Sequence, residues 1–220
     1  MASLAFVRSN IASFGGDASR ITLAGQSSGA QLIKTLLSTP SADSLFQRAI
    51  LQSAPLNNGD HSISTSESVG QVVLAASGCK TLRCLQAAPI AELLAAQNQA
   101  FIQAPKSVTG VAAGEPFRPV VDGSLVVKPF LSLVRDGGLS NTRRELMFTT
   151  VRNEAGPQTW MASSAQPVMP EEYSMYINYL IDPQRAQATL ASPLYQYNPN
   201  VPDGERVMIE EWGTDWQWRW

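Results

Sequence analysis

Residues 20–37, RITLAGQSSGAQLIKTLL, decide the fold of this chain. Residues 20–24 form a short apolar, β-prone run of the length expected for a strand buried on both faces, and residues 31–37 continue as a helix. Between them, Gly25-Gln26-Ser27-Ser28-Gly29 fits the pattern G-x-S-x-G. A strand before this pattern and a helix after it are the context of a nucleophile elbow, in which a serine lies on a sharp turn.

The residue types of this pentapeptide suit an exposed catalytic serine. We expect glycine at positions 25 and 29 because a side chain at either would collide with neighbouring backbone. Ser27 would then point into solvent at the carboxyl end of the sheet. There the N-terminus of the following helix and the Ser28 amide can donate hydrogen bonds to an oxyanion. The alternative is a Gly/Ser loop that begins an ordinary helix, with Ser27 as its N-cap.

The rest of the chain alternates strands with helices. Apolar runs predict two further strands at residues 48–52 and 146–151. Helical patterns are expected at residues 4–14, 69–76 and 90–100, from 170 onward, from 183 onward and at 207–220. This alternation indicates an α/β protein with a parallel sheet and crossover helices. No repeat or linker divides the chain, although residues 104–116 have a loop-like composition.

Composition and charge exclude several classes of partner. The chain has 16 basic and 18 acidic residues, a net charge of -2, and no basic stripe that would suit a phosphate backbone. We therefore expect no nucleic-acid partner. No apolar run is long enough for a membrane span. The N-terminus lacks the basic region of a secretory signal, so the sequence leaves the compartment open.

The two cysteines, Cys79 and Cys84, are five positions apart. Such a pair is either a small-loop disulfide or two neighbouring thiols, and both alternatives stay open. A zinc site is not expected, because zinc needs more ligands and the chain has a single histidine.

Six stretches, spread in order over nearly the whole chain, carry a resemblance to one protein family. They are NIASFGGDASRITLAGQSSGA, FQRAILQSAPL, SGCKTLRCLQAAPIAELLAAQ, PFRPVVDGSLV, LMFTTVRNEAG and GTDWQWRW. Together they resemble the type-B carboxylesterases, the family that includes cholinesterases and many fungal lipases and esterases; the last stretch resembles a fungal-type segment.

This resemblance implies the α/β-hydrolase fold, in part. It implies one incomplete domain over residues 1–220, with a sheet core in residues 1–156 and a helical region in residues 157–220. It also implies a disulfide in the cysteine-containing stretch, no metal or organic cofactor, and full-length relatives that are often secreted.

The resemblance further assigns roles to individual residues. Ser27 becomes the nucleophile, Ser28 an oxyanion donor through its backbone N–H, and Glu154 the acid that orients a histidine. The family commonly has this glutamate directly before a glycine, whereas Ala155 intervenes here. Asp122 is a rival acid, but Asp-Gly is more typical of a turn.

Two features have an ordinary interpretation beside a functional one. The Ser53 hydroxyl would either support the acid or serve the local turn after the second strand. Trp212, Trp216 and Trp218 would either line an acyl or alcohol pocket or pack in the core. Core packing is the simpler interpretation, since Trp212 and Trp216 lie four apart on one helix face.

The catalytic base is missing from this pattern. His61 is the only histidine and precedes Glu154, whereas the α/β-hydrolase order is nucleophile, acid, histidine. We expect His61 to be a solvated loop residue. The glycine-rich loop that completes an oxyanion hole does not precede the elbow either. The resemblance therefore predicts an internal slice of an esterase, with an exposed edge on its first strand.

Such a slice would have little or no activity on small-molecule or lipid esters, because an unassisted serine hydroxyl is a poor nucleophile. Two other hypotheses stay open. One is a non-catalytic adhesion protein on the cholinesterase-like fold, which would have no reason to retain Ser27. The other is a distinct small hydrolase that uses His61.

Overall fold

The computed structural model describes residues 1–57, 59–111, 115–138, 144–162, 167–181, 183–196, 198 and 200–219. The chain divides into two compact units. The first unit comprises residues 1–5, 34–45 and 59–143, and the second comprises residues 6–33, 46–58 and 144–220. Ser27, Ser53 and Glu154 all belong to the second unit, although they are far apart in the sequence.

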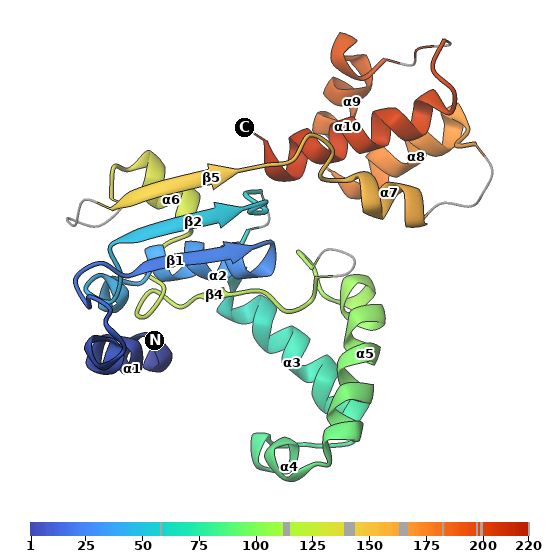
Figure 1. Ribbon diagram of the computed structural model, residues 1–220. Helices are drawn as coiled ribbons and strands as arrows, with labels where there is room; N and C mark the ends of the chain where they lie inside the picture. The colour runs from blue at the N-terminus through green and yellow to red at the C-terminus, as the bar shows by residue number, and fades with distance from the viewer. Residues whose placement is uncertain are drawn as a thin grey trace. The chain divides into compact units, whose positions relative to one another are not determined.

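A three-stranded parallel sheet lies in the second unit (Figure 1). Its strands are β1 (Thr22–Gln26), β2 (Arg48–Gln52) and β5 (Glu145–Thr149), in the spatial order β1-β2-β5. Gln26 lies beside Gln52, and Gln52 beside Thr149, so the three strands end together. The three predicted strands and their parallel arrangement are confirmed. The residues that follow the strands therefore meet at one carboxyl edge, where ligands of parallel α/β sheets bind.

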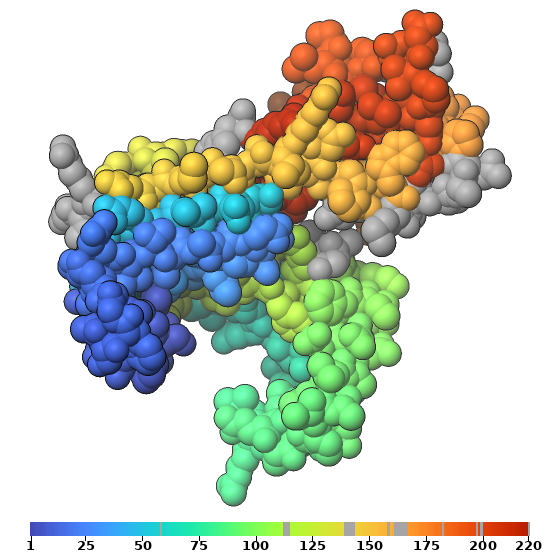
Figure 2. All heavy atoms as spheres, in the orientation of Figure 1, coloured from blue at the N-terminus to red at the C-terminus, as the bar shows by residue number. Residues whose placement is uncertain are grey.

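β1 is an edge strand of this sheet. Within the described part of the chain it pairs with β2 alone, so the predicted exposed edge is found. Its residues Thr22, Ala24 and Gln26 are exposed, and the prediction of a strand buried on both faces is wrong. Figure 2 shows β1, β2 and β5 as neighbouring blue, cyan and yellow bands at the surface. The central strand β2 is better covered, with Ala49 and Leu51 buried.

One helix follows β1 and several follow β5. α2 (Ser28–Leu37) begins at the elbow, and its residues from Lys34 onward belong to the first unit. The helices after β5 are α7 (Gly156–Ala162), α8 (Pro170–Leu180), α9 (Pro183–Ala191), the 3-10 helix η3 (Pro193–Tyr195) and α10 (Gly204–Trp218). The helices expected from 170, from 183 and near 207 are confirmed, whereas α7 was not expected.

The helical region after β5 has its own apolar core. It is formed by Tyr173 and Ile177 of α8, Ala186 of α9, and Met208, Ile209 and Trp212 of α10. Trp216 stacks on Trp212 with ring centroids 5.5 Å apart, which agrees with the core interpretation of these two tryptophans. The sequence also predicts Tyr176 on the buried face, but Tyr176 is exposed. The expectation is wrong because the face that α8 buries is narrower than the apolar spacing implies.

The N-terminus forms α1 (Ala2–Asn10) and the 3-10 helix η1 (Ile11–Phe14), not one helix over residues 4–14. Gly15 ends η1 in a left-handed conformation, φ +77°, as glycine commonly does after a helix. The predicted apolar face is not buried: neither helix contains a buried residue, and Phe14 is exposed.

The first unit contains a helical hairpin and a short strand pair. Its elements are η2 (Pro40–Ala42), β3 (His61–Ser62), α3 (Ile63–Ser77), α4 (Leu82–Ala87), α5 (Ile90–Ser107), β4 (Val120–Val121) and α6 (Phe130–Arg135). α3 packs against α5 around Val69, Ala104 and Val111. α5 continues through residues that the sequence suggested were a loop, because Ala96, Ala100 and Ala104 give it a buried small-residue face. β3 pairs with β4 in parallel.

Candidate functional site

Ser27 lies on the sharp turn between β1 and α2. Its φ is +52°, a left-handed conformation that is costly for a residue with a side chain. The Ser27 amide donates to the Gln52 carbonyl at 3.0 Å, and the Ser27 carbonyl accepts from the Gln31 amide at 2.9 Å. The turn thus connects the pairing of β1 with β2 to the hydrogen bonds of α2. Ser27 itself is exposed at the carboxyl edge.

Gly25 allows this turn to close. A Cβ at position 25 would lie 2.6 Å from the Gly29 carbonyl carbon and 2.9 Å from the Ala30 nitrogen, closer than carbon atoms can approach backbone. The end of β1 and the first turn of α2 therefore touch through a glycine. The same expectation for Gly29 is wrong, because a Cβ there would meet no described atom within 4 Å.

Ser28 is the first residue of α2. The amides of a first helical turn have no acceptor within the helix, and the helix dipole places partial positive charge at this end. Ser28 is exposed. An anionic oxygen beside the Ser27 side chain would therefore find both an N–H donor and a favourable electrostatic field.

Glu154 lies in the turn that follows β5. The residue is 8% exposed, and its Oε1 accepts a hydrogen bond from the Val151 amide at 2.8 Å. This bond fixes the carboxylate against the start of its own loop. A carboxylate held in this way can accept the N–H of an imidazole and keep that ring in one tautomer and orientation.

Helix α10 supports the acid loop. The Ala155 amide donates to Thr214 Oγ1 at 3.0 Å in a buried contact. The Ala155 methyl fits beside Gly213, where an added Cβ would lie only 2.9 Å from it. Glu210, one turn earlier, accepts from the indole N–H of Trp160 at 2.6 Å. These contacts hold Ala155, which stands between Glu154 and Gly156, against α10.

Sequence reasoning missed these supporting residues. Ala155 and Thr214 are 59 positions apart, and Trp160 and Glu210 are 50 apart. A hydroxyl or a glycine inside an otherwise helical run gives no sign of a distant partner. The one available signal was Gly213 itself, since glycine inside a helix is unfavourable unless close packing requires it.

Ser53 ends β2, between the elbow and the acid loop. It also has a left-handed backbone, φ +49°, and is 9% exposed. Its amide donates to the Thr149 carbonyl at 2.7 Å, and its carbonyl accepts from the Trp218 indole N–H at 3.1 Å. Among the described residues no hydrogen bond joins the Ser53 hydroxyl to Glu154. The observed role of Ser53 is therefore that of a strand end tied to α10.

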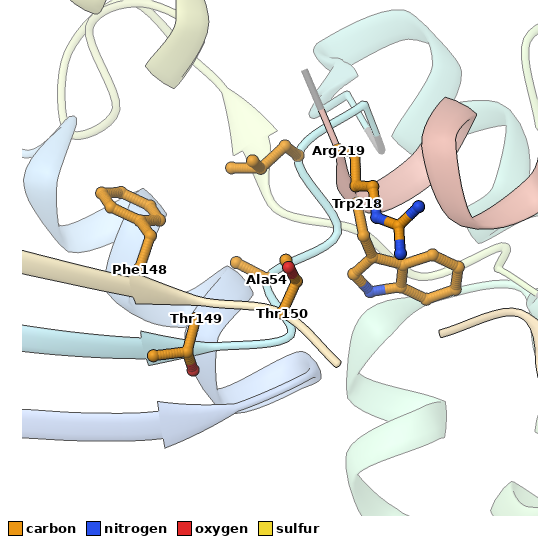
Figure 3. A pocket seen from close by; sticks show the side chains of 7 residues that line it. Ala54, Phe148, Thr149, Thr150, Trp218 and Arg219 are labelled. Carbon is orange, nitrogen blue, oxygen red and sulfur yellow. The ribbon is translucent and has the colours of Figure 1, made fainter. Parts of the chain in front are cut away.

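A pocket of about 270 Å³ opens at the ends of β2 and β5 (Figure 3). Ala54, Leu56, Phe148, Thr149, Thr150, Trp218 and Arg219 line it. Trp218 and Arg219 reach the pocket from the C-terminal end of α10. Of the three tryptophans considered from the sequence, Trp218 therefore contacts a pocket, while Trp212 and Trp216 pack in the helical core.

β2 separates the elbow from the acid loop. Since neighbouring strands lie about 4.8 Å apart, the ends of β1 and β5 are about 10 Å apart. The second unit thus holds Ser27, Ser28 and Glu154, the three site residues expected from the sequence, and its sequence contains no histidine.

The other candidate residues belong to the first unit. His61 is 4% exposed in β3, so the expectation of a solvated loop histidine is wrong; strand pairing with Val120 places it inside. Asp122 forms a turn, as its Asp-Gly sequence suggests: its Oδ1 accepts from the amides of residues 124, 125 and 126, which lowers the pKa of its carboxyl. Cys79 and Cys84 form a disulfide with Cα atoms 5.6 Å apart.

Metal and membrane sites can be addressed for the described ranges. In those ranges, no three His, Cys, Asp or Glu side chains gather in a way that would hold a metal ion. None of the helices in the same ranges combines the length and apolarity needed to cross a bilayer.

The parallel sheet, its crossover helices and the serine turn at the carboxyl edge define part of an α/β-hydrolase fold. Solved esterases share it. A thermophilic pNB esterase matches 99% of this chain and 42% of its own length, with a TM-score of 0.70 and 26% identity. Carboxylesterase EST55 of Geobacillus stearothermophilus matches 96% of this chain and 42% of its own, with a TM-score of 0.69 and 27% identity.

The family model for the carboxylesterase family matches residues 1–211, and the chain belongs to this family. Acetylcholinesterase of Myxine glutinosa is 31% identical over 160 residues, 69% of this chain and 45% of that protein. A probable N-octanoylanthranilate hydrolase of Rhodococcus erythropolis is 42% identical over 95 residues, 43% of this chain and 20% of that protein. The chain spans less than half the length of these relatives.

Proposed function

We propose that this chain carries the nucleophile and the acid of a serine carboxylic-ester hydrolase, Ser27 and Glu154. The observation that supports it best is the left-handed φ of +52° at an exposed serine between a parallel strand and a helix. Backbone strain of this kind gathers at functional sites. Ser53 shares the left-handed conformation but is buried, whereas Ser27 is exposed at the start of a helix.

The chemistry follows from the geometry. Ser27 Oγ attacks the carbonyl carbon of an ester, and the resulting oxyanion accepts from the Ser28 amide at the start of α2. A base takes the Ser27 proton and passes it to the leaving alcohol, and Glu154 stabilises that base in its charged form. Water then releases the acid from the acyl-enzyme. The pocket of about 270 Å³ beside Trp218 has room for a short acyl or alcohol group.

The base is the part that residues 1–220 do not offer at the site. His61 is the single histidine, and its ring is buried in the strand pair of the first unit. We therefore expect residues 1–220 alone to turn over esters very slowly, because the Ser27 hydroxyl is a weak nucleophile without a base.

A chemical-rescue experiment tests both statements. The full 220-residue chain and its Ser27→Ala variant are incubated with p-nitrophenyl butyrate and with a fluorophosphonate probe, with and without added imidazole. Ser27→Ala is the control for hydrolysis by imidazole itself. We expect little turnover without imidazole, and labelling and turnover with imidazole that depend on Ser27.

Two results would contradict the proposal in different ways. Equal labelling of wild type and Ser27→Ala, with imidazole present, would remove Ser27 as nucleophile and favour a binding protein. Ser27-dependent turnover without imidazole would instead show that the chain has its own base. In that case His61→Ala would test whether His61 supplies it.

A further inference from the structure

His61 is a buried titratable group that ester hydrolysis does not use. It begins β3, where its amide donates to the Pro119 carbonyl at 2.8 Å and its residue lies beside Val120 of β4. The residue is 4% exposed, and neither ring nitrogen has a hydrogen-bond partner in the described part of the chain. Buried polar atoms without partners are rare, so this ring has an unusual environment.

The charges around His61 favour its neutral form. Arg118, two residues before Val120, donates from Nη1 to the Gly59 carbonyl at 3.3 Å and forms an ion pair with Glu115 at 2.8 Å. Burial lowers the pKa of His61 below 6.5, the Arg118 charge lowers it further, and Glu115 opposes this in part. The hydrogen bond from Arg118 to the Gly59 carbonyl therefore holds the segment that contains His61 beside a guanidinium group.

Lys34 and Asp60 extend the group of charges around Arg118 and Glu115. Lys34 of α2 is also buried, at 3% exposure, and it interacts with the charges of Asp60, Arg118 and Glu115. α3 packs against both β3 and β4, but its charged residue, Glu67, is exposed. A proton on His61 would thus meet the positive charge of Arg118, opposed by the Glu115 carboxylate that Arg118 already engages.

We propose that His61 makes the first unit acid-sensitive: when its imidazole takes up a proton, the β3–β4 pair opens and the ring moves to solvent. A charged imidazole cannot stay in the interior without a hydrogen-bond acceptor, because its desolvation is not compensated. β3 and β4 are two residues long each, so few backbone hydrogen bonds resist the opening. This acid response of the first unit does not depend on ester chemistry at Ser27.

The direction of the pH dependence follows from linkage. The unfolded chain binds the histidine proton with the ordinary pKa of 6.5, and the folded unit binds it more weakly. The contribution of His61 to stability is therefore complete above pH 6.5. It is lost as the pH falls below 6.5 toward the lower pKa of the folded state.

The sequence allows the acid sensitivity of the first unit to be tested without isotopic or fluorescent labels. His61 is the single histidine, so its imidazole gives one set of NMR resonances. All five tryptophans lie at or after position 160, in the second unit, so their fluorescence reports on that unit and not on the first. Amide hydrogen exchange along α3 reports on the first unit.

The experiment compares the full chain with His61→Phe, which keeps a buried ring and cannot titrate. We expect the wild-type imidazole to titrate below 6.5, and the protection factors of α3 amides to fall several-fold between pH 7.5 and 5. Tryptophan fluorescence should stay constant, and His61→Phe should keep its protection at pH 5. If His61→Phe does not fold, the wild-type data decide by their midpoints: the fall in α3 protection must coincide with the titration of the imidazole, and a fall at a different pH contradicts the proposal.

Three results would overturn the proposal. The first is an imidazole that titrates at or above 6.5. The second is protection along α3 that is the same at pH 5 and pH 7.5. The third is a His61→Phe variant that loses protection in acid as wild type does, which would assign the effect to carboxylates.

Discussion

The indole N–H of Trp218 donates a hydrogen bond to the backbone carbonyl of Ser53 at 3.1 Å, in a buried position. This bond ties the last turn of α10 to the strand end between the elbow and the acid loop. The amide of Leu56 adds a second tie, donating to the Gln217 carbonyl at 2.9 Å. The C-terminal helix is thus part of the carboxyl edge of the sheet.

Replacing Trp218 with phenylalanine should therefore destabilise the second unit. The ring stays, but the Ser53 carbonyl loses its donor inside the protein, which costs about 1–3 kcal/mol. Urea unfolding followed by the remaining tryptophans measures the change. Trp216→Phe is the matched control, because it also removes one indole but keeps a ring against Trp212. An equal loss in both variants would show that the Ser53 bond contributes nothing specific.

Alanine at Gly25 should be far more damaging than alanine at Gly29. The first Cβ would collide with the Gly29 backbone at 2.6 Å, whereas the second meets open space. We expect Gly25→Ala to lose about 2 kcal/mol or more, as overpacking of backbone against backbone does, and Gly29→Ala to change stability little. Urea unfolding monitored by tryptophan fluorescence distinguishes them. Similar midpoints for the two variants would contradict the close approach of β1 and α2.

Two helix glycines should respond in opposite directions to alanine. In α10, a Cβ at Gly213 would lie 2.9 Å from the Ala155 methyl, so Gly213→Ala should displace the acid loop and destabilise the unit. In α3, a Cβ at Gly70 meets nothing within 4 Å, so Gly70→Ala should stabilise its helix by about 0.5–1 kcal/mol. Circular dichroism at 222 nm during urea unfolding measures both. A gain in both variants would mean that Ala155 does not pack against α10.

The stability of the first unit should rise as the pH increases into mild alkali, because Lys34 loses its buried charge there. Burial lowers its pKa from 10.5 to about 8, with Asp60 opposing the shift. Between these two pH values the unfolded chain binds more protons than the folded one, so stability rises with pH there. At neutral pH the buried charge costs about 3 kcal/mol, from the conversion of the pKa difference to free energy.

Lys34→Met lacks this titration. Its free energy of unfolding should exceed that of wild type most at pH 7, and the excess should shrink as the pH rises from 8 to 10.5. Urea unfolding curves of both proteins, collected every half pH unit, give the comparison. A constant difference across the window would place Lys34 in contact with solvent.

The disulfide between Cys79 and Cys84 should stabilise the end of the α3–α5 hairpin. It closes a loop of five positions, and the chain-entropy relation gives about 2 kcal/mol for a loop of this length. Reduction should increase hydrogen exchange in α4 while tryptophan fluorescence of the second unit stays unchanged. A Cys79→Ser, Cys84→Ser double variant should show the same exchange with and without reductant. Unchanged exchange in reduced wild type would show that helix packing alone holds α4.

The elements that sequence patterns predicted well are those with local causes. Ser27 was found because the G-x-S-x-G spacing, the strand before it and the helix after it lie within 18 residues. The parallel sheet followed from alternation of apolar runs with helical patterns. Glu154 depended on resemblance, since a single loop glutamate carries no pattern of its own.

The errors have a common physical origin in distant partners. β1 has the composition of a buried strand, yet three of its five residues are exposed, and these three alternate along one face of the strand. His61 looked like a loop residue because its partner strand lies 59 positions later. Periodicity reports which face of an element is apolar, and only the assembled unit decides whether that face is covered.

The turn at Asp122 has a consequence for chemical ageing. Asp-Gly sequences isomerise when the glycine nitrogen attacks the aspartate side chain, a reaction that needs a free and preferably protonated carboxyl group. Three backbone amides hold the Asp122 carboxylate, keep it ionised and point it away along the chain toward Val126. Gly123 supplies the φ of +73° that this arrangement requires. The Asp122-Gly123 dipeptide is thereby protected from isomerisation for as long as that turn stays folded.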